Sequence, residues 1–120
     1  MAATIEELAA RVFVARDAAH RAHWKTGSYA AHMALGDLYE ALPDSIDEIV
    51  EVYQGEFGLI GEFEVHAGAV ANVTTFLQAE ADWIAEGRDE IARGSTAVQN
   101  LIDGLLADYR RAIYKLTQLT

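Results

Sequence analysis

Apolar residues recur at intervals of three and four along most of the chain, the spacing of helices that each bury one face. Thr4 with Glu7 three residues later matches a capping box, and Gly27 is a residue type that often follows a helix end. The sequence therefore predicts a first helix that runs to about Thr26. Its apolar positions are Ile5, Leu8, Val12, Ala15, Ala19 and Ala22.

A second helix is predicted after Ser28, which can cap its first turn. Pro43 interrupts it, and proline inside a helix costs ~3 kcal/mol or more because it removes a backbone hydrogen bond and clashes with the preceding turn. The apolar period keeps its phase on both sides, so we expect one kinked helix that ends near Gly55 rather than two short helices. Its apolar positions are Leu35, Leu38, Tyr39, Leu42, Ile46, Ile49, Val50 and Tyr53.

Residues 55–72 contain four of the nine glycines and no clean helical period, which predicts a long connection with at most a short helical turn. Beyond it we expect a third helix that starts at Asn72 or Thr74 and ends at residues 93–94, and a fourth helix capped by Ser95. Nothing resembles a strand. The prediction is an all-α four-helix bundle of ferritin-like connectivity, with one long crossover between helices 2 and 3.

Length and composition are those of a single domain over residues 1–120 that needs no disulfide or structural metal to build a core. The chain has no cysteine, which excludes thiolate metal ligands and cysteine nucleophiles. No apolar run approaches the ~20 residues that span a bilayer. The N-terminal segment has acids where a signal peptide has basic residues. We therefore expect a cytoplasmic protein with no membrane partner.

The formal net charge is −10, from nineteen acidic and nine basic residues. Proteins that bind nucleic acid neutralise phosphates with lysine and arginine, and this chain has neither an excess of them nor a basic tail. We expect no nucleic-acid partner, and an acidic chain of this kind is better suited to binding cations.

Three of the four histidines, His20, His23 and His32, lie within thirteen residues around Gly27. If the first two helices form an antiparallel hairpin, His23 and His32 lie at similar heights and can face each other. On this spacing alone, a packed and hydrogen-bonded pair is the simpler interpretation, and the nitrogen side of a metal site is the alternative.

Asp47 and Glu51 place two carboxylates on one face of the second helix, about 6 Å apart. Such pairs are common on solvated helices. His32 shares this face but lies ~22 Å away along the helix. One chain therefore cannot bring its histidines to its own carboxylates, whereas two copies packed antiparallel about a twofold axis can. Imidazole with carboxylate ligands suits iron, zinc, manganese or cobalt.

Residues 23–51, HWKTGSYAAHMALGDLYEALPDSIDEIVE, resemble the ferroxidase signature of the Dps proteins, the miniferritins, and small ferritin-like proteins encoded by phages are similar as well. The shared pattern is a His-Trp pair, a glycine-bearing loop, a second histidine and an Asp-Glu-x-x-Glu motif fifteen residues later. The resemblance implies that His23 and His32 of one subunit bind metal together with Asp47 and Glu51 of its twofold partner, with Glu51 as the bridging ligand.

The same resemblance assigns Trp24 to a position beside the site. His20 is expected to be a surrounding or core residue and is a weaker ligand candidate. Asp37 is also a weaker candidate, because it lies ~100° further round the helix and matches a different position of the family. The family has an acid one turn after the second histidine, where this chain has Gly36. The loop between the two histidines is also three residues shorter than in the family. With one carboxylate fewer, both a single-metal and a two-metal centre stay open, as does any contribution of His66.

The resulting prediction is an iron-binding (or zinc- or manganese-binding) homo-oligomer that oxidises Fe(II) between subunits, as a dimer or as a dodecameric shell. The alternative is a non-catalytic helical assembly or interaction protein on a ferritin-like scaffold. Gly36 and Pro43 both weaken the second helix, which favours that alternative.

Overall fold

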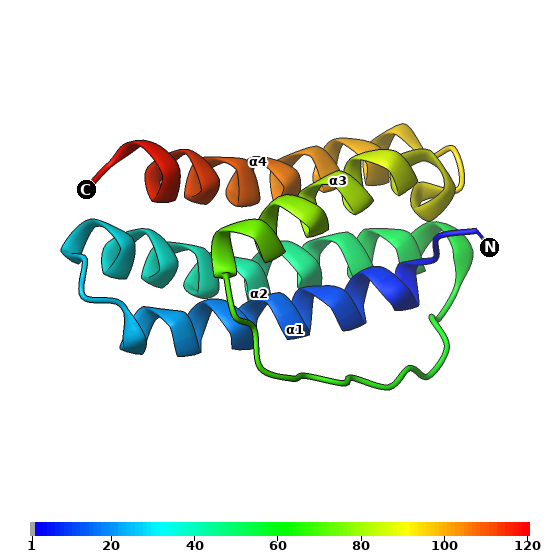
Figure 1. Cartoon of the computed structure of the whole chain (residues 1–120). Helices are drawn as coiled ribbons and strands as arrows, with labels where there is room; N and C mark the ends of the chain where they lie inside the picture. Colours follow the sequence, from blue (N-terminus) through cyan, green and yellow to red (C-terminus); the bar gives the residue numbers. More distant parts are fainter. Residues whose placement is uncertain (1) are drawn as a thin grey trace.

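The computed structural model describes residues 2–120, and these form four helices and no strand. The helices are α1 (Ile5–Lys25), α2 (Tyr29–Phe57), α3 (Val73–Ala92) and α4 (Thr96–Gln118). α1 and α4 each pack against both α2 and α3, and each of these neighbouring pairs runs antiparallel (Figure 1). The predicted all-α architecture of four packed helices is thereby confirmed.

Short polar side chains begin all four helices, as the sequence predicts. Thr4, Ser28, Asn72 and Ser95 each accept a hydrogen bond of 3.0–3.2 Å from the backbone N–H three residues later. Each bond satisfies one of the N–H groups that a helix start leaves without an intrahelical partner. The Glu7 carboxylate lies 3.5 Å from Arg11 Nε rather than on Thr4, so the capping box is only half formed.

The end of α2 differs from the sequence prediction, whereas α1 ends within one residue of the predicted position. α2 is continuous through Pro43, as one helix, but it extends to Phe57, and Gly58 follows with φ of 90°. Gly27 does not adopt a positive φ, because the extended residue Thr26 already turns the chain out of α1. The α1–α2 connection is therefore tight, and it holds the last turn of α1 beside the first turns of α2.

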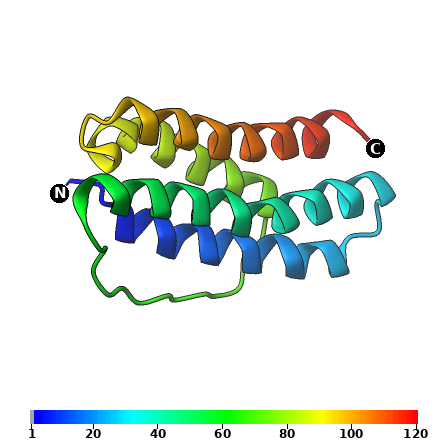
Figure 2. The ribbon, with the colours of Figure 1, turned by 180° about the vertical axis from the view of Figure 1, so that it is seen from behind.

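Residues 58–72 connect α2 to α3 without regular secondary structure and lie along the outside of α1 (Figures 1 and 2). The predicted long connection is present, without a helical turn. Phe63 attaches it to α1, since its ring centroid lies 5.9 Å from that of Phe13. Glu6 attaches it near its start, where a carboxylate oxygen accepts a 2.7 Å hydrogen bond from the Gly61 N–H.

A single cluster of buried apolar side chains fills the space between the helices and contains most of the predicted apolar positions. No helix within residues 2–120 is both long and apolar enough to cross a membrane. The largest fully buried side chains are Tyr109, Ile5, Leu8, Leu35, Leu42, Ile49, Leu77, Ile84, Ile91, Ile102, Leu105 and Val12.

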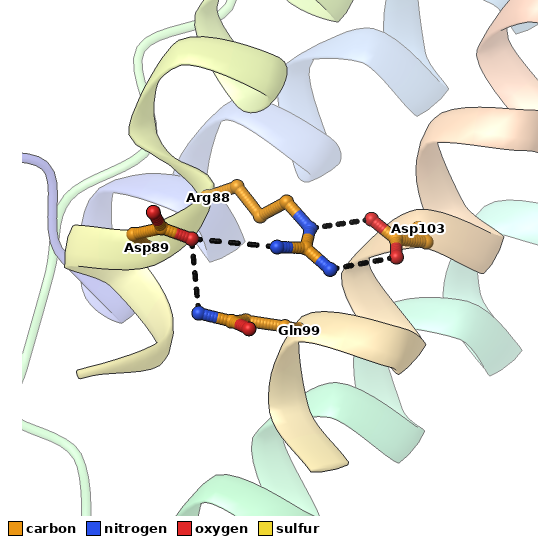
Figure 3. Close-up of polar contacts among 4 residues, drawn as sticks. All are labelled: Arg88, Asp89, Gln99 and Asp103. Atoms are coloured by element: carbon orange, nitrogen blue, oxygen red, sulfur yellow. Dashed lines mark hydrogen bonds and ion pairs between the residues drawn. The ribbon is translucent and has the colours of Figure 1, made fainter. Parts of the chain in front are cut away.

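Arg88 of α3 forms a bidentate ion pair with Asp103 in the first turns of α4, at 2.6 and 2.8 Å (Figure 3). Asp89 contacts Arg88 and also accepts a 2.9 Å hydrogen bond from Gln99. The hydrogen bonds from Arg88 lower the pKa of Asp103, so this stabilisation is present at neutral pH and is lost as the pH falls through the folded pKa. Because both side chains are largely solvated, the pair orients the helix ends more than it stabilises the fold.

Candidate metal site at the α1–α2 turn

The imidazoles of His23 and His32 stack on each other where α1 turns into α2. Their ring centroids are 3.7 Å apart and their planes differ by 18°. His23 Nδ1 lies 2.6 Å from the carbonyl oxygen of His32, and His32 Nδ1 lies 2.9 Å from that of His23. A carbonyl oxygen only accepts, so each Nδ1 carries a proton and donates it. In the neutral form of each ring, the free lone pair is therefore on Nε2.

This histidine stack combines the two interpretations of the sequence. His23 lies in the last turn of α1, where carbonyls lack intrahelical donors, and the His32 ring supplies one of them. The stack is thus a helix cap. Metal-ligating histidines also donate their second ring N–H to a carbonyl, a carboxylate or water, which fixes the tautomer. Because the cap uses Nδ1 and leaves Nε2, the same geometry is compatible with both interpretations.

The stack limits how metal can bind. A ligating imidazole points its lone pair, within its own ring plane, at an ion about 2.0–2.1 Å away. The planes of His23 and His32 are nearly parallel and displaced from each other, so one ion cannot lie in both planes at once. Either each ring binds its own ion, or one ring leaves the stack.

Gly36 provides the space that the His23 ring occupies. A Cβ atom at Gly36 would lie 3.1 Å from His23 Cε1 and 3.3 Å from Nδ1, closer than ordinary van der Waals contact. Glycine in a helix interior costs about 0.5–1 kcal/mol relative to alanine. A larger side chain at position 36 would therefore require the stacked His23 ring to shift by a few tenths of an ångström.

Aromatic and apolar side chains surround the histidine stack. The His20 ring stacks on Tyr39, with centroids 4.0 Å apart and planes 11° apart, and lies 4.6 Å from Trp24. His20 is therefore engaged in aromatic packing. Trp24 is 71% exposed, and Tyr29 and Met33 in the first turns of α2 are exposed as well. Large apolar side chains thus remain in solvent around this turn of the single chain.

The two carboxylates Asp47 and Glu51 lie in the second half of α2, both exposed. Because α2 is unbroken, its 1.5 Å rise per residue keeps Asp47 ~22 Å from His32 along the axis. Within the described chain neither carboxylate forms an ion pair. They border an open hollow of about 210 Å³ whose walls include Phe13 and Phe63.

The weaker candidate ligands Asp37 and His66 lie away from the histidine stack. Asp37 faces α4, where its carboxylate is 3.6 Å from Lys115 Nζ, and His66 contacts Glu64 at 2.9 Å within the connection. Neither is brought to the histidine stack. Over residues 2–120, no group of three or more His, Asp or Glu side chains lies close enough to hold a metal ion. A complete site built on the stack therefore needs ligands from outside the chain.

Glu80 on α3 is a buried charge that the sequence pattern does not single out. It is 8% exposed and accepts a 2.8 Å hydrogen bond from Arg11 Nη1. Burial raises the pKa of Glu80, and the charge of Arg11 lowers it. The Tyr109 hydroxyl nearby is buried without a hydrogen-bond partner in the described chain, and burial raises its pKa too. The sequence signal that could have identified Glu80 is its position within a helical stripe of apolar residues, Leu77, Ala81 and Ile84.

A family model described as a family of unknown function (DUF5856) matches residues 23–116. The matched range begins at His23 and contains all four principal candidate ligands. No curated protein and no solved structure gives a significant match to the chain. The function therefore has to be inferred from the residues and their geometry.

Proposed function

We propose that this chain, which belongs to the DUF5856 family of unknown function, is a ferritin-like protein that binds Fe(II) or a similar divalent ion between two of its copies. His23 and His32 of one copy and Asp47 and Glu51 of the other are the ligands. One observation carries the proposal: both Nδ1–H groups of the stack are bonded to carbonyls, which leaves both Nε2 lone pairs for metal.

The charges of these ligands support a divalent ion. One neutral imidazole and two carboxylates carry −2 together, which balances the charge of one divalent ion held by one ring. Carboxylate oxygens and imidazole nitrogens without thiolate suit iron, zinc or manganese. The net charge of −10 also raises the local concentration of cations around the protein.

The exposed apolar side chains support pairing of two copies through α1 and α2. Phe13 and Trp24 share a face of α1 and are 46% and 71% exposed, and Met33 of α2 is 45% exposed. Exposed apolar surface of this kind often marks an interface. In an antiparallel twofold pair, the histidine stack of one copy meets the carboxylates of the other, twice per dimer.

Fe(II) bound at this site would be a substrate. It would give up one electron to an external oxidant such as dioxygen, which would be reduced in turn, while the ligands of the two chains hold the ion. The role of the chain is to hold the ion: the carbonyls fix the tautomer of both imidazoles, and the carboxylates neutralise the charge that increases on oxidation. We expect Glu51 to bridge when each imidazole holds its own ion.

Anaerobic titration calorimetry with Fe(II), or with Zn(II), tests the proposal. Wild type is expected to bind one or two ions per chain: one if a ring leaves the stack, two if each ring holds its own ion. His32→Ala and Glu51→Ala are each expected to abolish stoichiometric binding, because both copies contribute to one site. His66→Ala, in the exposed connection, is the control and should bind as wild type. Wild-type protein that takes up no metal, or that is strictly monomeric by solution mass, contradicts the proposal.

One observation favours the second candidate, a helical assembly protein without metal chemistry. The His32 ring caps α1, a role that needs no metal. Under this candidate His32→Ala lowers stability, wild type binds no metal, and the protein is still oligomeric. The same calorimetry and a thermal melt therefore distinguish the two functions.

A further inference from the structure

A second hollow lies at the same end of the bundle as the histidine stack, on a different face of α1. It has a volume of about 340 Å³ and lies between the last turns of α1, the start of α2 and residues 68–74. Its walls are about equally polar and apolar, and the apolar part includes Ala18, Ala22, Leu35, Val70, Val73 and Leu116. We refer to it as the Lys25 hollow.

The polar groups of the Lys25 hollow are cationic or hydroxylic. Arg21 and Lys25 line it together with Thr26 and Thr74, and none of the nineteen acidic residues does. Arg21 Nε lies 3.3 Å from the Asp17 carboxylate, which neutralises part of the charge of Arg21. Lys25 forms no ion pair within residues 2–120. In a chain of net charge −10, this is a locally positive wall.

The overall negative charge does not prevent an anion from binding there. At physiological ionic strength the Debye length is about 8 Å, so exposed acids farther away than this are largely screened. Arg21 and Lys25 line the hollow itself, so an anion bound there would contact them directly. Anion binding in the hollow is therefore decided by these two side chains rather than by the net charge.

The size and polarity of the Lys25 hollow limit the class of ligand that it can bind. Pockets for small molecules typically measure about 300–1,000 Å³, with apolar walls and a few polar groups that fix orientation. The Lys25 hollow is at the small end of that range. We propose that it binds a small organic carboxylate with an aliphatic body, the carboxylate at Lys25 and Arg21 and the aliphatic chain along the alanine and leucine wall. This site is separate from the proposed metal site.

Titration calorimetry of the full chain with octanoate tests this proposal. We expect saturable one-to-one binding, weakened about tenfold or more in Lys25→Ala and in Arg21→Ala, because a hydrogen bond to a charged group contributes ~1.5–3 kcal/mol. Ala31→Leu, which fills the hollow from α2, should weaken binding as well. Arg16→Ala, which removes an exposed cation of α1 outside the hollow, should bind octanoate as wild type does.

Three results would overturn it. Octanoate that shows no saturable binding leaves no site. Equal binding of 1-octanol and octanoate shows an apolar hollow without carboxylate recognition. Complete displacement of octanoate by an equal concentration of sulfate shows an anion site without an aliphatic subsite. Circular dichroism of each variant confirms that a loss of binding is not a loss of fold.

Discussion

The Arg11→Ala variant is expected to lose about 3 kcal/mol of unfolding free energy at neutral pH. Removing one partner of a buried ion pair leaves the other charge uncompensated and costs ~3–5 kcal/mol. Arg11 itself is partly exposed, so its loss belongs at the lower end of that range. The guanidinium also lies 4.2 Å from the Trp83 ring centroid, a contact worth ~0.5–1 kcal/mol near the surface. Urea denaturation measures the loss.

The pH dependence of this loss identifies Glu80 as its cause. Burial raises the folded pKa of Glu80 above its ordinary value of 4.5, so its contribution to stability falls as the pH rises from about 4.5 through the folded pKa. Arg11 lowers that folded pKa. Without Arg11 the folded pKa of Glu80 is higher, so the decrease in stability continues to higher pH and is larger. The variant should therefore approach wild-type stability below pH 4.5.

Two further variants control this experiment. Glu80→Gln in the Arg11→Ala background should restore most of the stability, since the amide buries no charge. Arg16→Ala removes an exposed cation of the same helix and should change stability by less than ~0.5 kcal/mol. An Arg11→Ala loss that is the same at pH 4 and pH 8, or that Glu80→Gln does not reduce, would show that Glu80 is not responsible.

The Gly36→Val variant is expected to expel the His23 ring from the histidine stack and to lower metal affinity ten- to a hundredfold. The valine side chain requires the space that His23 Cε1 and Nδ1 occupy. Expelling the ring removes its Nδ1–H hydrogen bond to the His32 carbonyl, and loss of a group that orients a metal ligand typically costs ~10–100-fold in affinity. Nitrogen NMR of the ring reports the loss of the fixed Nδ1–H tautomer without metal.

Gly104→Val is the matched control. Gly104 lies inside α4, and a Cβ atom there would meet nothing within 4 Å. The same chemical change should therefore leave both the histidine spectrum and metal affinity as in wild type. If Gly36→Val keeps the wild-type tautomer and affinity, the fit of Gly36 to the ring has no functional role.

The four helices could be predicted because their signals are local. Each begins at a capping side chain followed by an apolar period, and α3 ends in a left-handed turn at Arg93 and Gly94, with φ of 53° and 80°. The path of residues 58–72 could not be predicted, because a segment without a period has no signal of its own. Its contact through Phe63 is with Phe13 of another element, α1. The end of α2 was missed by two residues for a similar reason, because Gly55 is tolerated inside the helix.

The candidate ligands were also identifiable from spacing, but their arrangement was not. The pairing of His23 with His32 follows from a hairpin at Gly27, whereas the reciprocal hydrogen bonds depend on the extended turn at Thr26. The role of Gly36 depends on a ring from another helix, which no pattern within α2 can show. The partner of the buried Glu80 is Arg11 of α1, which no pattern within α3 can show.

The shared site is tested most directly by mixing two chains that each lack half of it. One chain carries His23→Ala and His32→Ala, and the other carries Asp47→Ala and Glu51→Ala. In a twofold heterodimer one of the two sites is complete, so an equal mixture refolded together should bind about a quarter of the Fe(II) that wild type binds, while either chain alone binds none. A mixture that binds no metal while wild type does, or full binding by either chain alone, would contradict a site shared between copies.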